Sequence, residues 1–108
     1  MRQANIYYCN QLAGVLTEDE NGYTFQYDTL YLSAEHPNAI TLTMPLTHEP
    51  YHNMVLFPFF DGLIPEGWLL DIAEKNWKIN RRDRMSLLLA CCKDCIGAIS
   101  VVPIINEE

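Results

Sequence analysis

The chain is 108 residues long, about the modal size of one domain, and hydrophobic residues make up 49% of it against 19% charged residues. These proportions are close to globular averages and exclude disordered, collagen-like and coiled-coil classes. Seven Lys and Arg residues against fourteen Asp and Glu residues give a formal net charge of −7, which disfavours direct binding to nucleic acid or to an anionic membrane. The acidity belongs to the first half, because residues 1–63 hold one base and seven acids whereas residues 64–108 hold six bases and seven acids.

The N-terminal segment does not have the pattern of a secretory signal peptide, and the apolar runs are far shorter than the roughly 20 residues that span a bilayer. We therefore expect a cytoplasmic protein. In a reducing compartment the four cysteines, Cys9, Cys91, Cys92 and Cys95, are expected to be thiols.

The first third of the chain has the pattern of short β-strands rich in aromatic and branched residues. These strands are predicted at residues 6–9, 12–16 and 23–27, with turn-forming residues at 10–11 and 19–22. Asn21-Gly22 predicts a hairpin with a type I′ turn, whose two central residues both need a positive φ. Residues 39–44 (Ala-Ile-Thr-Leu-Thr-Met) alternate between apolar and polar side chains and predict a fourth strand, which Pro45 ends.

The period becomes helical from Pro65, a residue well suited to the first helical position. Asn80 is the predicted cap of a second helix. The apolar positions of that second helix, at i, i+3, i+4 and i+7, are Met85, Leu88, Leu89 and Cys92. Leu87 and Cys91 widen the apolar arc, so we expect this helix to be largely buried.

Residues 96–105 predict a final strand, which completes the order β, β, β, β, α, α, β. The expected fold class is α+β: a small antiparallel sheet or partial β-barrel of about five strands covered by two helices. Residues 1–108 contain no internal repeat and no long linker, so a single domain is predicted.

Two clusters resemble metal or redox sites superficially. Cys92 and Cys95 have Cys-x-x-Cys spacing, but the pair closes a helix instead of opening one and a second ligand pair is missing. The cysteines are therefore expected to be structural, buried or half-buried thiols. His48 and His52 are four residues apart with Pro50 between them, so a zinc-binding helix is disfavoured and a solvated loop is expected.

Trp68-Leu69-Leu70 is the most informative local feature. Three consecutive large apolar residues span about 200° of a helical wheel, so one core face cannot hide all of them. Trp68 is expected either to pack at the edge of the core or to contact a partner, where tryptophan is enriched among energetically dominant residues.

Residues 59–67 (Phe-Phe-Asp-Gly-Leu-Ile-Pro-Glu-Gly) resemble the Phe-Phe-x-x-Leu-Leu-Pro-Glu-Gly signature of the N-terminal subdomain of HipA-type serine/threonine kinases. Residues 14–27 are similar to that subdomain's opening Gly-x-Leu, Gly and Phe-x-Tyr strands, and residues 42–46 to its Leu-Ser-x-Pro-Leu segment. Residues 87–98 are similar to its closing Leu-Leu-x-x-x-Gly-x-Asp-Cys-x-Gly-Ala motif, except that Cys92 stands in place of the first Gly. The second helix is therefore expected to run on or to end differently here.

The resemblance covers almost the whole chain and implies a HipA N-terminal subdomain 1-like domain. In a full-length HipA-type kinase the ATP-binding and catalytic subdomains follow this segment, whereas here the sequence stops at Glu108. The resemblance therefore implies a stand-alone subdomain similar to the HipS antitoxin of HipB, HipS and HipT systems. Such a protein has no enzyme activity and no cofactor or metal of its own.

The implied partner is a separate HipT-like serine/threonine kinase toxin, joined in a ternary complex by a HipB-like helix-turn-helix DNA-binding protein. We expect the kinase contact at the start of the helix that begins at Pro65, with Trp68 as anchor and Pro65, Glu66 and Leu70 around it. Two alternatives stay open. One is a non-inhibitory subunit that helps the kinase and a HipB-like repressor assemble on operator DNA, and the other is a small redox or zinc protein that uses Cys92 and Cys95.

Overall fold

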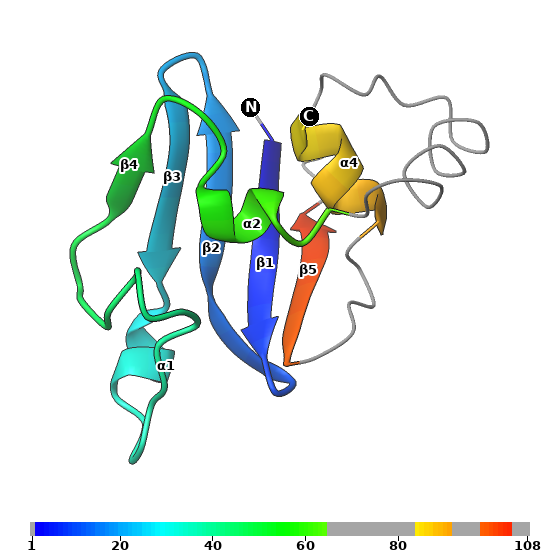
Figure 1. Cartoon of the computed structure of the whole chain (residues 1–108). Coiled ribbons are helices and arrows are strands. Elements are labelled where there is room, and N and C mark those ends of the chain that lie inside the picture. The colour runs from blue at the N-terminus through cyan, green and yellow to red at the C-terminus, as the bar shows by residue number, and fades with distance from the viewer. Residues whose placement is uncertain (1, 65–83, 92–97, 105–108) are drawn as a thin grey trace.

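The computed structural model describes residues 2–64, 84–91 and 98–104, which form a five-stranded antiparallel sheet with short helices (Figure 1). The sheet order is β4-β3-β2-β1-β5. The strands are β1 (Arg2–Tyr8), β2 (Gln11–Asp19), β3 (Gly22–Tyr27), β4 (Tyr51–Asn53) and β5 (Ile99–Ile104). The described helices are α1 (Thr29–Leu32), α2 (Pro58–Asp61) and α4 (Arg84–Cys91). The predicted α+β fold class is confirmed.

The helices α2 and α4 lie over one face of the sheet, where α2 crosses β1 and β2 in Figure 1. The side chains beneath them are the apolar residues of alternate strand positions, as expected for a sheet with one covered face. Fully buried examples are Ile6 of β1, Leu16 of β2, Phe25 of β3 and Val101 of β5. The core is therefore built from both ends of the sequence.

The two predicted hairpins form, but the type I′ turn is in the other one. Cys9 and Asn10, between β1 and β2, have φ values of 50° and 67°, so both central positions are left-handed as this turn type requires. At the β2–β3 connection Asp19 pairs with Gly22, so the loop is Glu20-Asn21 and Gly22 already belongs to the strand. The type I′ prediction at Asn21-Gly22 was therefore wrong, because strand register moved the Asn-Gly pair one position out of the turn.

Residues 39–44 are not a strand. Ile40 and Met44 are buried, but Leu42 between them is 98% exposed, whereas a strand would place all three on one face. The N–H of Met44 donates to the Thr41 oxygen at 3.2 Å, which closes a turn. The fourth strand is β4 instead, so His52 lies in a strand and its ring nitrogen Nδ1 is 3.3 Å from Thr24 Oγ1.

The later elements agree with the sequence pattern wherever the structure describes them. Met85, Leu87 and Leu88 of α4 are fully buried, as the wide apolar arc predicts. β5 confirms the final strand, one edge of which pairs with β1. The helix predicted to begin at Pro65 lies outside the described residues, as does the expected altered end of the second helix at Cys92. In the described parts of the chain no helix is long and apolar enough to cross a membrane.

Tyrosine hydroxyl groups hold the loop between α1 and β4. The Tyr27 hydroxyl accepts from the Ile40 N–H at 3.1 Å and donates to the Met44 carbonyl oxygen. The Tyr51 hydroxyl donates to the Pro45 oxygen at 2.6 Å. These contacts replace the strand ladder that the alternating pattern of residues 39–44 predicted, because side-chain oxygens satisfy the backbone groups.

We expect Tyr27→Phe to lower the free energy of unfolding by about 1–3 kcal/mol, because two buried backbone groups lose their shared partner. Burial raises the pKa of Tyr27 above its ordinary value of 10.0, and the hydrogen bond from Ile40 offsets part of that rise. The unfolded chain therefore loses this proton at lower pH than the folded chain, so stability is complete below pH 10 and falls as the pH rises above it. Urea unfolding of both proteins at pH 8 and above pH 10 measures the effect.

The variant should lose less stability than the wild type over that pH interval. Some dependence should persist, since burial also raises the pKa of Tyr31. An identical loss in the two proteins would contradict a role for the Tyr27 hydroxyl in the alkaline response.

Candidate protein-binding surface around α2

The short helix α2 contains the start of the 59–67 segment. Pro58 is its first residue, where the missing N–H leaves no hydrogen bond unmade. The N–H of Gly62 donates to the Pro58 oxygen at 2.9 Å and the N–H of Leu63 to the Phe60 oxygen at 3.0 Å, which ends the helix. The N–H of Ile64 donates to the Asp61 oxygen at 3.2 Å, so a hydrogen-bonded turn carries the chain from α2 to Ile64.

Phe60 anchors α2 on the sheet. Its side chain is fully buried, and its ring centroid lies 5.6 Å from that of Phe25 in β3. Phe57 and Phe59 contact the Phe60 ring as well, with centroid separations of 6.1 and 5.2 Å. These tilted and edge-on arrangements are those that aromatic pairs prefer. Ile64 is also buried, so Phe60 and Ile64 hold the end of the described segment against the core.

An ion pair joins α2 to α4. Arg84 Nε lies 2.6 Å from Asp61 Oδ1, and both side chains remain partly exposed. An exposed pair of this kind contributes about 0–1 kcal/mol to stability. Its main consequence is geometric, because it holds together the two described segments that border residues 65–83.

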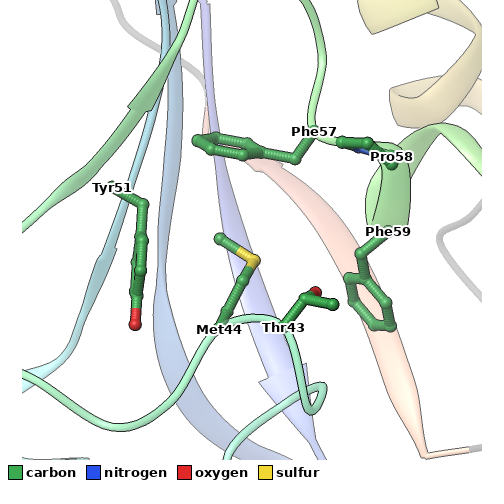
Figure 2. A pocket seen from close by; sticks show the side chains of 6 residues that line it. All are labelled: Thr43, Met44, Tyr51, Phe57, Pro58 and Phe59. Atoms are coloured by element: carbon green, nitrogen blue, oxygen red, sulfur yellow. The ribbon is translucent and has the colours of Figure 1, made fainter.

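Two hollows flank α2. The first, of about 200 Å³, is lined by Thr43, Met44, Tyr51, Phe57, Pro58 and Phe59. Figure 2 shows Met44 and Thr43 between Tyr51 on one side and Phe59 on the other. The second, of about 400 Å³, is lined by Val55, Leu56, Pro58, Asp61 and Arg84. Val55 is 66% exposed, so the surface around α2 combines open apolar side chains with concave sites, as binding surfaces do.

The residues predicted to bind a partner, Pro65, Glu66, Trp68 and Leu70, lie outside the described residues. The described residue next to this segment is Ile64, whose side chain is buried. The role of the four residues therefore stays a prediction.

Cys9 is a free cysteine, as expected of a thiol, and is exposed at the tip of the β1–β2 turn. A turn that needs two left-handed residues places its side chains in solvent, whatever their polarity. Cys92 and Cys95 lie outside the described residues, as does the side chain of Cys91. Within the described parts no group of three or more His, Cys, Asp or Glu side chains could hold a metal ion.

Sequence reasoning missed the exposed Leu42, the tyrosine contacts and the hollows. The alternating pattern of residues 39–44 predicted that Leu42 lies on the same strand face as Ile40 and Met44. A signal was present in Pro37 and Pro45, which bracket residues 39–44, since proline is poorly suited to a central strand.

A family model described as the HipA N-terminal domain matches residues 4–102. The chain belongs to this family. The HipA N-terminal domain family is associated with toxin–antitoxin systems, and the matched region is the N-terminal domain and not the kinase domain.

Individual comparisons agree with the family assignment. A solved structure described as "N-terminal domain of HipA toxin" superposes with a TM-score of 0.73, covering 99% of this chain and 96% of that one at 24% identity, which shows the shared fold. An uncharacterized protein of Haemophilus influenzae is 29% identical over 101 residues, which cover 94% of this chain and 92% of that protein. "Putative kinase Y4mE" of Sinorhizobium fredii is 25% identical over 104 residues, but this chain spans only 25% of its length.

Proposed function

We propose that this HipA N-terminal domain protein is an antitoxin that binds and neutralises a separate HipT-like serine/threonine kinase by blocking or inactivating its active site. The observation that carries the proposal is the way the same domain occurs in two relatives. It accounts for nearly all of the Haemophilus influenzae protein but only a quarter of the protein named as a kinase. A domain that occurs both alone and joined to a kinase is suited to binding that kinase in trans.

The charge distribution supports this partner. Residues 3–74 contain no lysine or arginine. The phosphate-binding cleft of a kinase is cationic, because lysine and metal ions neutralise the charge of the nucleotide. An acidic domain is attracted to such a cleft and gains association rate from the attraction.

The proposed contact is the segment just beyond α2, with Trp68 as anchor and Pro65, Glu66 and Leu70 around it. The anchoring of Phe60 and Ile64 supports this assignment, because it holds the chain firmly up to the residue before Pro65. A rigidly held starting point lowers the entropy lost when an adjacent segment binds.

The deciding experiment measures autophosphorylation of a purified HipT-like serine/threonine kinase, with and without an equimolar amount of this protein. No DNA-binding protein is added. The proposal expects strong inhibition, whereas the accessory-subunit alternative expects none and instead requires tighter assembly of the kinase and a HipB-like repressor on operator DNA. Unaltered kinase activity in the presence of a formed complex would favour that alternative.

Trp68→Ala is expected to weaken the kinase complex by about 2–4 kcal/mol, or roughly 30- to 1,000-fold, because a buried tryptophan anchor loses most of its contact area. Isothermal titration calorimetry measures the change. Leu30→Ala, a change at an 82% exposed leucine of α1, is the control and should bind as the wild type does. Unchanged affinity in Trp68→Ala, with an unaltered circular dichroism spectrum, would remove Trp68 from the interface.

A further inference from the structure

Leu42 is displayed to solvent in an unusual way. Its side chain is 98% exposed, while Ile40 and Met44 on either side are 6% and 4% exposed. The two buried neighbours fasten the turn to the core at both ends, and the leucine between them is the most exposed large apolar side chain of the described residues. Single exposed apolar residues are common, so the surroundings decide whether this one has a role.

The backbone that carries Leu42 is held from several sides. The Tyr27 hydroxyl contacts both Ile40 and Met44, and the Tyr31 hydroxyl donates to the Asn38 carbonyl oxygen at 2.5 Å. The turn itself is closed by the Met44 N–H. A leucine on a backbone fixed in this way loses little freedom on binding, which is the main advantage of a preorganised contact.

The apolar hollow beside α2 begins at the next residue of the turn. Thr43 and Met44 form one wall of it, and Tyr51, Phe57, Pro58 and Phe59 form the rest (Figure 2). Its lining contains no charged side chain among the described residues. Leu42 can insert into a cleft on a partner, and the adjacent hollow of about 200 Å³ can receive a side chain from that partner. Such mutual insertion gives the shape complementarity that is typical of protein interfaces.

The charge around this feature defines the partner. The loop of residues 33–50 carries Glu35 and Glu49 and no lysine or arginine. Among the described residues the bases are Arg2 and Arg84, and each is already paired, with Glu18 and Asp61 respectively. A loop that carries acidic side chains and contributes to an apolar hollow is complementary to a protein surface that combines basic and apolar side chains.

We propose that Leu42 and the hollow lined by Thr43, Met44, Tyr51, Phe57, Pro58 and Phe59 form a second docking site for the kinase, separate from the Trp68 contact. The proposal rests on the proposed function, because it takes the same kinase as occupant. Leu42 enters an apolar cleft on the kinase, an apolar kinase side chain fills the hollow, and basic kinase residues face Glu35 and Glu49. This site holds the complex together, whereas the Trp68 segment acts on kinase activity.

The test measures the affinity of each variant for a catalytically inactive form of the same HipT-like kinase that is used to test the proposed function. Leu42→Asp should weaken binding about 10- to 100-fold, because an inserted leucine is replaced by a charge. Leu30→Asp makes the same change at another exposed leucine and should leave the affinity unchanged. Since both leucines are exposed in the free protein, neither variant is expected to alter the melting temperature.

A second pair of variants tests the charge. Glu49→Lys should slow association at low salt by several-fold, whereas Glu20→Lys, in the β2–β3 turn at the other end of the sheet (Figure 1), should not. Wild-type affinity in Leu42→Asp would overturn the second docking site while leaving kinase inhibition by the wild-type protein intact. If the wild-type protein itself did not bind the kinase, the proposed function and this site would both be wrong.

Discussion

Replacing Phe60 with alanine is expected to lower the free energy of unfolding by about 3–5 kcal/mol, the range for removal of a fully buried aromatic side chain. The ring is completely buried and contacts the rings of Phe25, Phe57 and Phe59. Its removal leaves a cavity between α2 and the sheet that the neighbouring rings fill only in part. Because small domains have only about 5–15 kcal/mol of stability in total, the variant should be near its unfolding threshold. Urea denaturation followed by circular dichroism measures the loss.

Phe59→Ala is the matched control, since it removes the same side chain from the preceding position. Phe59 is only half-buried and packs at the edge of the core, so we expect a loss of about 1–2 kcal/mol, a fraction of that for a fully buried ring. Comparing the two variants therefore tests whether the loss of stability follows the depth of burial at these two neighbouring residues. Equal losses in both variants would show that Phe60 is not the anchor of α2.

Gly14→Ala is expected to cost about 3 kcal/mol, the upper end of the range for overpacking. Gly14 lies in β2, opposite the irregularity between Ile6 and Tyr7 in β1. A Cβ atom added there would overlap the Gln26 carbonyl oxygen and lie 2.8 Å from the Phe25 ring. Since the closest atom belongs to the backbone of β3, a side-chain rotation cannot relieve the overlap, and the two strands must move apart.

Gly62→Ala provides the control for the glycine substitution. Gly62 has φ −68°, which any residue adopts, and an added Cβ meets its nearest atom, the Pro58 oxygen, at 3.3 Å. The Pro58 oxygen has to shift by only a few tenths of an ångström, so we expect the free energy of unfolding to change by less than about 1 kcal/mol. Thermal unfolding of both variants measures the difference, and a Gly14→Ala protein as stable as Gly62→Ala would mean that β2 and β3 can separate at little cost.

Hydrophobic periodicity predicted the parts of this fold that depend on local pattern. Apolar residues recur every second position in the hairpin strands and in β5, and at helical spacing in α4. The side of each element that faces the core can therefore be predicted without knowing which element packs against it. The signature of residues 59–67 likewise indicates the family through its residue types and spacing alone. It does not distinguish structural from binding positions within the signature, and Phe60 and Ile64 proved to be core residues.

The errors occurred where a distant residue determined the local conformation. Residues 39–44 have the alternation of a strand, but the Tyr27 hydroxyl of β3 binds their backbone groups and a turn forms instead. The Asn21-Gly22 pair has the composition of a type I′ turn, but the pairing of Asp19 with Gly22 places it out of position. Neither the hydroxyl nor the register is visible in a local window.

The sequence by itself therefore determined the family, the order of most elements and the acidic character of the surface, because these depend on composition and on short-range pattern. Only the tertiary structure decided which apolar residues are buried and which are displayed. Leu42 and Met44 are two residues apart and both apolar, yet one is almost fully exposed and the other lies in the core. Tyrosine hydroxyl groups from β3, α1 and β4 hold the backbone on both sides of Leu42, and that arrangement exists only after the chain has folded.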